Sequence, residues 1–377
     1  MTEADLFVRL LTSSAPRWVA AKWGLIAASV ILMGSGCVAP KITADPVYYP
    51  SAPAVAHAVH IKSFNRLDEL IPLRPTLADV LRGQSISPEV AKPAGIAHVA
   101  GHLYICDTDM NAIHDWDLAT GAARQLGTDG DARLSKPVAV AVDGDGNPYV
   151  ADTGRSEVVA FGDDGRVRFR LRPPERKTYR PTALAIRGSV LQVTDIASHK
   201  VDAFATEDGR HLGSFGEVGS ALGQFYFPMG LAADATGRLL LSDMMNGRVQ
   251  VFDGENHAVL SMGQPGDRYG DMGKPRQLAV GPDGVIFVAD PEFGRVHLFD
   301  NQGRLLMLLG GDGEQIGSTP MPVGVAVATE LPESISSLVP ADFRADYYLF
   351  VCNTVGVRRI SLFAIGRQVG GEARDDE

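Results

Sequence analysis

The chain has 377 residues, of which 45% are hydrophobic and 41 are glycine, so it can bury one large core. Its formal net charge of −10 excludes sequence-independent nucleic-acid binding, which draws its affinity from clustered Lys and Arg side chains that neutralise phosphates. No long stretch has low complexity, so we expect a mostly globular protein.

The first 36 residues have the pattern of an export signal. Arg17 and Lys22 precede the apolar run WGLIAASVILMGSG at residues 23–36, which is too short to cross a bilayer. The stretch LMGSGC resembles the lipobox of bacterial lipoproteins, in which the cysteine, here Cys37, becomes the lipidated N-terminus, although Gly34 stands where Leu is usual. The alternative is an uncleaved N-terminal anchor. Either pattern takes the rest of the chain out of the cytoplasm.

Residues 37–57 are expected to form a tether. Four prolines in VAPKITADPVYYPSAP favour an extended, semi-rigid chain. Val38 resembles the sorting pattern of outer-membrane lipoproteins, since Asp at that position retains such proteins at the inner membrane. We therefore expect a protein of the cell envelope, held at the membrane by lipid on Cys37 and facing the periplasm or the exterior.

The remainder of the chain repeats a pattern of a proline, an apolar run and an acid. The prolines are Pro93, Pro137, Pro181, Pro228, Pro275 and Pro322. A strand-ending polar residue follows each of them at Asp107, Asp152, Asp195, Asp243, Asp290 and Asn353. A polar residue that recurs in every copy is a feature of the repeat, so it belongs to the fold before it belongs to any site.

Each repeat has the sequence pattern of four short strands. In the fourth copy, the apolar runs GLAAD, RLLLSD, RVQVFD and AVLSMG are separated by the turn signals ATG, MNG and DGEN. Four-stranded units at a period of 40 to 50 residues predict a β-propeller, because packing the units in a ring buries sheet faces that one unit cannot cover alone. The predicted fold class is all-β.

The repeats resemble the NHL repeat. The segments AVAVDGDGNPYVAD, GLAADATGRLLLSD and QLAVGPDGVIFVAD align without gaps, and six copies over residues 92–366 imply a six-bladed NHL propeller. Members of this family include binding modules for proteins or RNA and a few enzymes, among them an amidating lyase. Gluconolactonases have similar propellers. The resemblance therefore implies a fold more firmly than a function.

Closure of the ring is predicted to use the N-terminal side of the domain. The sixth repeat supplies only three strands before the polar tail at residues 367–377, whereas Ala58–Phe64 (AVHIKSF) lies upstream of the first repeat without a blade of its own. We expect this segment to complete blade six, so the propeller spans residues 58–366. A short helix is expected in TLADVLRG, with Thr76 as its N-cap and Gly83 after its end.

The repeated acids are followed five residues later by a basic residue in four of the six copies. The residues at this position are Ala112, Glu157, Lys200, Arg248, Arg295 and Arg358. We expect the acid to brace its turn, either through an ion pair with that base or through hydrogen bonds from the backbone. Catalysis is the alternative, but near-equivalent copies are what a fold requires, whereas an active site needs asymmetry.

Asymmetry is expected at the mouth of the central channel. The residues before each proline are Lys92, Lys136, Arg180, Phe227, Lys274 and Met321, and Arg276 adds a further cation nearby. One interpretation is that these cations neutralise the aspartates beneath them. The other is a pocket for an anionic ligand, with Phe227 and Met321 as its apolar side.

Two classes of function follow. The favoured one is a lipid-anchored binding or scaffold propeller that presents a disc face to an envelope protein, a polysaccharide or a small anionic ligand. The alternative is a metal-dependent lyase or lactonase acting near the channel. The nine histidines lack zinc-site spacing and no CxxCH motif occurs, so no catalytic residue, metal ligand or cofactor is assigned. Cys106 and Cys352 are expected to be buried free thiols packed between blades.

Overall fold

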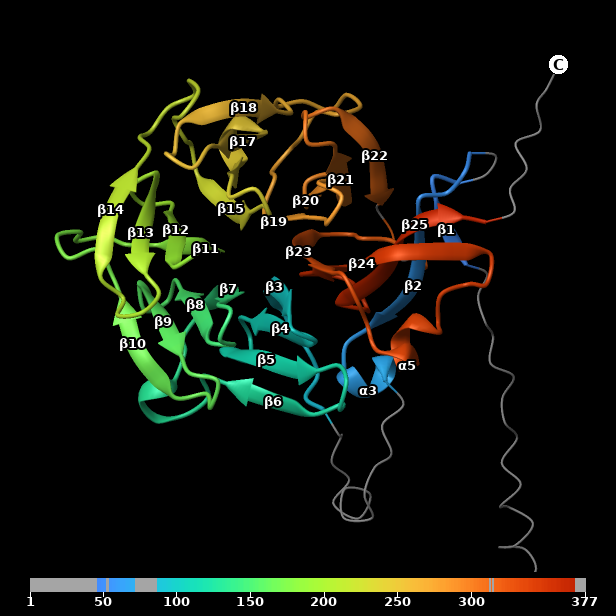
Figure 1. Cartoon of the computed structure of the whole chain (residues 1–377), viewed down its shortest axis with the longest axis horizontal. Coiled ribbons are helices and arrows are strands. Elements are labelled where there is room, and N and C mark those ends of the chain that lie inside the picture. Colours follow the sequence, from blue (N-terminus) through green and yellow to red (C-terminus); the bar gives the residue numbers. More distant parts are fainter. Residues whose placement is uncertain (1–45, 52–53, 72–86, 312, 314, 370–377) are drawn as a thin grey trace, which may run out of the picture. The chain divides into compact units, whose positions relative to one another are not determined.

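The computed structural model describes residues 46–51, 54–71, 87–311, 313 and 315–369. These residues form six antiparallel sheets around a central axis, as Figure 1 shows. The chain is therefore an all-β, six-bladed propeller, as predicted. The signal peptide, Cys37, most of the tether, the helix expected around Thr76 and the end of the tail lie outside the described residues.

The strands of blades one to five follow one another along the chain. Blades one and two contain β3 (Pro93–Val99), β4 (His102–Asp107), β5 (Ala112–Asp117), β6 (Ala123–Leu126), β7 (Pro137–Val142), β8 (Pro148–Asp152), β9 (Glu157–Phe161) and β10 (Val167–Leu171). Blades three and four contain β11 (Pro181–Arg187), β12 (Val190–Asp195), β13 (Lys200–Ala205), β14 (His211–Phe215), β15 (Pro228–Ala233), β16 (Leu239–Asp243), β17 (Arg248–Phe252) and β18 (Ala258–Met262). Blade five contains β19 (Leu278–Val280), β20 (Ile286–Asp290), β21 (Arg295–Phe299) and β22 (Leu305–Gly310).

Blade six joins the two ends of the domain. Its strands are β23 (Pro322–Ala328), β24 (Phe343–Asn353), β25 (Ile360–Gln368), β2 (Ala58–Phe64) and β1 (Val47–Tyr49). The predicted closing strand β2 pairs antiparallel with β25, so the closure is confirmed. The fifth strand β1 was assigned to the tether by sequence, but it pairs with β2, and the Tyr49 hydroxyl donates to the Gly317 carbonyl at 2.9 Å. The chain therefore joins the propeller earlier than residue 58.

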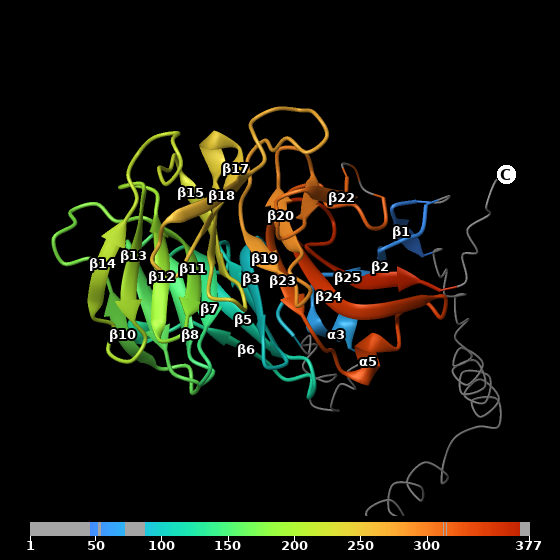
Figure 2. The same ribbon diagram turned by 45° about the horizontal axis from the view of Figure 1, so that its top comes forward.

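Helical segments in the described part of the chain are short. They are α3 (Leu67–Leu70), α5 (Glu333–Ser336) and the 3-10 turns Gly130–Ala132 and Met244–Asn246. Among the residues described, no helix is long and apolar enough to cross a membrane. Figure 2 shows α3 and α5 at the periphery, beside blade six, so neither of them lies at the axis.

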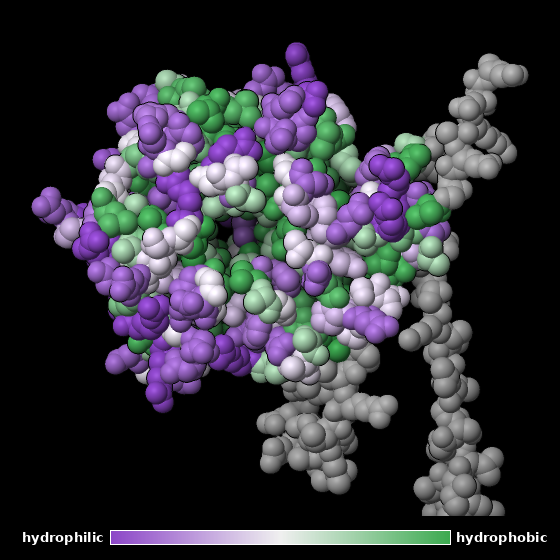
Figure 3. Space-filling model, in the orientation of Figure 1, coloured by the Kyte–Doolittle hydropathy of each residue, from purple (hydrophilic) through white to green (hydrophobic). Residues whose placement is uncertain are grey.

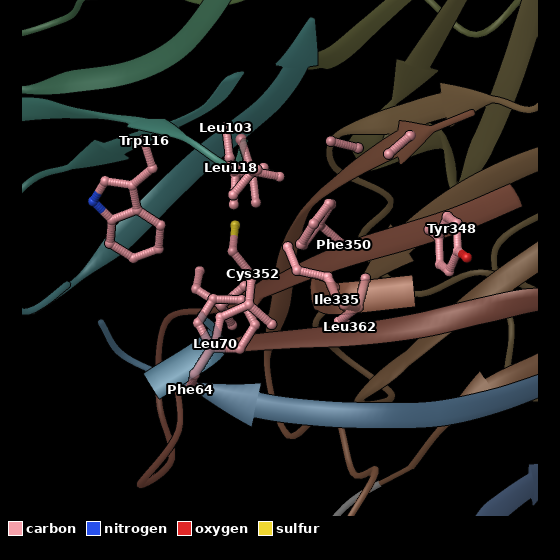
Figure 4. Packing of buried hydrophobic residues seen from close by; sticks show 14 of the residues in the cluster. Phe64, Leu70, Leu103, Trp116, Leu118, Ile335, Tyr348, Phe350, Cys352 and Leu362 are labelled. Carbon is pink, nitrogen blue, oxygen red and sulfur yellow. The ribbon is translucent and has the colours of Figure 1, made fainter. Parts of the chain in front are cut away.

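The core is divided into six hydrophobic clusters, and each lies between two adjacent blades. Figure 4 shows the largest, where Phe64, Trp116 and Ile335 pack between blades six and one. Cys352 belongs to this cluster and Cys106 to the next one, between blades one and two. Both cysteines are buried, as predicted, and both are free thiols. Burial raises the pKa of each thiol, so neither is poised as a nucleophile.

Candidate functional site

The strand-ending aspartates hold the loops between blades. Asp290 accepts hydrogen bonds from the backbone N–H groups of Gly273 at 2.7 Å and Lys274 at 3.0 Å, just before the repeat proline, and from Glu292 at 3.2 Å in the next turn. Asp152 makes the same contacts with Ser135 and Lys136 at 2.7 and 2.8 Å. This geometry matches the backbone form of the predicted brace.

The other strand-ending acids accept different numbers of hydrogen bonds from the loop before their repeat proline. Asp107 accepts from the N–H groups of Ala91 and Lys92, Asp195 from Arg180 and Asp243 from Tyr226. Asn353 replaces the acid in blade six, and its buried side-chain amide has no hydrogen-bond partner among the described residues. All six side chains belong to fully buried residues, so these groups are part of the frame.

The ion-pair form of the prediction is wrong for most copies. Within the described chain, Arg248 alone pairs with its own strand-ending acid, at 3.0 Å from Asp243. Arg295 instead lies over the ring of Phe293 and donates to its carbonyl, and Arg358 pairs with Glu69. The hairpin register pairs Asp290 with Arg295 and Val288 with His297, so the residue seven positions after the acid is a diagonal neighbour of the acid on the same face of the sheet.

Sequence reasoning missed this diagonal position, seven residues after the acid, although it can be read from the aligned repeats. Its occupants are His114, Val159, Asp202, Gln250, His297 and Ile360. The His297 ring lies 3.3 Å from Asp290, and His114 lies 3.3 Å from Asp107. Burial by itself raises the pKa of Asp290, but the nearby His297 ring and the hydrogen bonds from the two loop N–H groups outweigh it and lower that pKa.

Blade three places two buried carboxylates together. Asp202 is the diagonal cross-strand neighbour of Asp195, and the Arg176 guanidinium from the preceding loop bonds to both of them. His211 contacts Asp202 at 3.3 Å, beside an open cavity of about 350 Å³ that Arg176 helps to line. Burial raises the pKa of Asp202 despite its cationic neighbours. Arg176 therefore serves as an internal counter-ion.

The cations predicted to form a ring lie on the surface. Lys92, Lys136, Arg180 and Lys274 are all exposed. Lys92 lies 3.8 Å from Asp109, and Lys274 lies 2.6 Å from Glu292, so two of the four are paired with neighbouring acids. Met321 is 37% exposed. None of these side chains lines the cavity on the axis.

A cavity of about 90 Å³ lies on the axis, between the inner strands of the blades. It is lined by Ala94, Val138, Ala139, Thr182, Ala183, Leu184, Met229, Arg276, Gln277 and Val323. Each blade contributes the residue that follows its repeat proline. Figure 3 shows the hollow at the centre of one disc face, with apolar side chains along part of its rim. Of the predicted ligand-binding residues, Arg276 alone lines this cavity.

Arg276 is the one cation among the residues that line the cavity. Its side chain makes no ion pair or hydrogen bond with any described residue, and its Nε is buried. Burial lowers the pKa of the guanidinium, and no acidic group offsets that effect. Thr182 occupies the same repeat position in blade three and also lines the cavity. Its hydroxyl is already bonded to Thr194 and to the Pro228 carbonyl, each at 2.9 Å.

Gln277, the residue after Arg276, links two blades that are not adjacent in the ring. Its Nε2 donates to the Ile96 carbonyl in blade one at 2.6 Å, and its Oε1 accepts from the Ile96 N–H at 3.2 Å. The side chain passes over Gly324 of blade six, where a Cβ would come within 2.5 Å of the amide oxygen. Gln277 therefore joins blades five and one, and both of its amide groups are engaged.

A cluster of aromatic rings breaks the repeat in blade four. The N–H of Phe227 donates to His199 Nδ1 at 3.2 Å, whereas the equivalent N–H groups in blades one, two, three and five donate to the strand-ending acid. Phe227 has a φ of 63°, a left-handed conformation that is strained for an aromatic residue. Tyr226 stacks on His199 with ring centroids 5.6 Å apart and is itself 43% exposed.

Comparison with known structures defines the class of this protein as a six-bladed β-propeller. A streptogramin B lyase matches with a TM-score of 0.52 and 11% identity, over 73% of this chain and 94% of that one. A catalytically inactive virginiamycin B lyase from Staphylococcus aureus, solved with quinupristin, matches with a TM-score of 0.51 and 14% identity, over 73% and 96% of the two chains. At such identities the likeness shows the fold alone. No protein-family model matches the sequence.

Proposed function

We propose that this protein is an NHL-type binding propeller of the cell envelope, anchored by lipid at Cys37, whose axial cavity receives an anionic group of its ligand. The observation that carries the proposal is Arg276, whose half-buried side chain lines an apolar cavity and whose buried Nε has no acceptor among the described residues. A buried charge is costly unless it is paired. An anionic ligand would supply the missing acceptor.

The strand-ending aspartates do not serve as counter-ions for Arg276. Their oxygens are occupied by backbone N–H groups and by local side chains, as at Asp290 and Asp152. Among the described residues no carboxylate forms an ion pair with Arg276, and burial lowers the pKa of its guanidinium. Arg276 therefore fits a role in ligand binding better than a role in neutralising the strand-ending acids.

The surface cations would act before the ligand reaches the cavity. Lys136 and Arg180 are exposed, and their side chains have no ion pair or hydrogen bond in the described part of the chain. Exposed cations raise the local concentration of anions in a salt-dependent way. An acidic envelope protein or polysaccharide fits this surface, whereas nucleic acid does not fit a chain with a net charge of −10.

The experiment has two arms on the full-length protein. Cys37→Ser should move the protein from the membrane to the soluble fraction or leave its precursor unprocessed. In detergent, calorimetric titration with sodium acetate, sodium phosphate and sodium chloride should show binding of at least one anion that Arg276→Met abolishes. Unchanged fractionation of the first variant would defeat the lipid anchor, and absence of any Arg276-dependent binding would defeat the site.

A propeller enzyme of lyase or lactonase type is the second candidate. On this chain it is favoured by His102, whose Nδ1 lies 2.7 Å from the buried Asp115, because an oriented imidazole can act as a general base. Arg124 holds the same carboxylate from the other side, at 2.6 Å. Two results together would favour this candidate. The protein would retain a stoichiometric divalent ion through dialysis, and His102→Gln would lose the lyase or lactonase activity of the wild type.

A further inference from the structure

Resting on the proposed anion site, we infer that the group bound at Arg276 is a single carboxylate that carries a short apolar substituent. This carboxylate could belong to a free short-chain acid or to the end of a longer ligand that extends along the channel. Three properties of the cavity lead to this assignment: its charge, its hydrogen-bonding groups and its volume.

The charge of the cavity favours a monoanion. Arg276 supplies one positive charge, and the other residues that line the cavity are neutral. A monocarboxylate neutralises that charge. A phosphate carries about −1.5 to −2 charges at neutral pH, so it would leave an uncompensated negative charge in an apolar surrounding, which is strongly disfavoured.

The hydrogen-bonding groups favour two acceptor oxygens over four. A guanidinium presents a planar fork that matches both oxygens of one carboxylate. The other polar groups are already engaged, since Gln277 bonds to both backbone groups of Ile96 and the Thr182 hydroxyl bonds to Thr194 and Pro228. A tetrahedral oxyanion would therefore leave oxygens without donors, whereas a carboxylate would not.

The volume and the walls favour a small alkyl substituent. The cavity of about 90 Å³ equals roughly three waters at ~30 Å³ each, and it is smaller than the ~150 Å³ apolar cavity that takes benzene. A group of about three to five heavy atoms fits that space. Val138, Met229 and Val323 provide apolar walls that would contact a methyl or ethyl group and would not compensate a hydroxyl.

The test uses the full-length protein in detergent and calorimetric titration at constant ionic strength. Acetate and propionate should bind at least ~10-fold more tightly than inorganic phosphate or chloride, a margin of about 1.4 kcal/mol. Arg276→Met should abolish this binding without lowering the melting temperature in buffer alone, because an unpaired, half-buried charge does not stabilise the fold. The matched control is Arg155→Met, which removes an exposed arginine and should bind like the wild type.

Two further measurements separate the outcomes. Val138→Leu keeps the charge of the cavity but narrows it, so it should weaken the binding of propionate more than the binding of acetate. This test remains valid even if Arg276→Met fails to fold. Hexanoate binding as tightly as propionate would assign the carboxylate to a longer ligand, and exclusion of hexanoate would assign it to a free short-chain acid. Phosphate or chloride binding equal to acetate would overturn the carboxylate inference and leave the proposed function standing. Absence of all Arg276-dependent binding would overturn both.

Discussion

Replacing Asp290 by alanine tests whether the repeated acid is a part of the frame. The carboxylate joins the loop before the repeat proline to the turn after β20, through the N–H groups of Gly273, Lys274 and Glu292. Alanine would leave the two loop N–H groups without their acceptor. Each such loss costs about 1–3 kcal/mol, and water replaces part of it at this part-buried loop, so we expect a loss of about 2–4 kcal/mol. Typical domains have only 5–15 kcal/mol of stability, so this loss is large.

The assay is denaturant unfolding of Asp290→Ala beside Asp300→Ala. Asp300 lies in the same blade and also accepts two backbone N–H groups, but its turn is exposed, so its loss should cost far less. Because the pKa of Asp290 is lowered in the folded protein, the pH dependence of stability provides a second measurement. The stability that it contributes is present above the unfolded pKa of about 3.9 and is lost as the pH falls below it, so the difference between wild type and Asp290→Ala should shrink in acid. Equal losses in the two variants would refute the framework role.

Three other substitutions test the fold and its buried charges by thermal or denaturant unfolding. Arg176→Met should cost about 3–5 kcal/mol because it leaves Asp195 and Asp202 buried without their counter-ion, and a loss below about 1 kcal/mol would contradict that role. Gly324→Ala should lower the melting temperature because the new methyl would come 2.5 Å from the Gln277 amide oxygen, and an unchanged melting temperature would show that the link from Gln277 to Ile96 is dispensable. Burial lowers the pKa of His60 to about 4, so stability should decline as the pH falls from about 6.5 towards 4, and this decline should be smaller in His60→Gln.

The sequence by itself determined the architecture of this protein. The proline-to-acid period and the apolar runs predicted the blades, because the inner strands of a blade need two buried faces and each turn needs its own residue types. The missing fourth strand of the last repeat predicted that Ala58–Phe64 closes the ring, and β2 does so. These features are local or periodic, so they can be recognised without knowledge of distant contacts.

The tertiary structure decided which side chains reach the axis. Lys274 and Arg276 are two residues apart, yet Lys274 is exposed and paired with Glu292, whereas Arg276 lines the axial cavity. Sequence could not separate them, because the direction of each side chain depends on how the strand enters the ring. The contact of Gln277 with Ile96 joins residues 181 positions apart. Such a contact exists only after the blades have closed, which is why the unpaired charge at the axis became visible only in the folded protein.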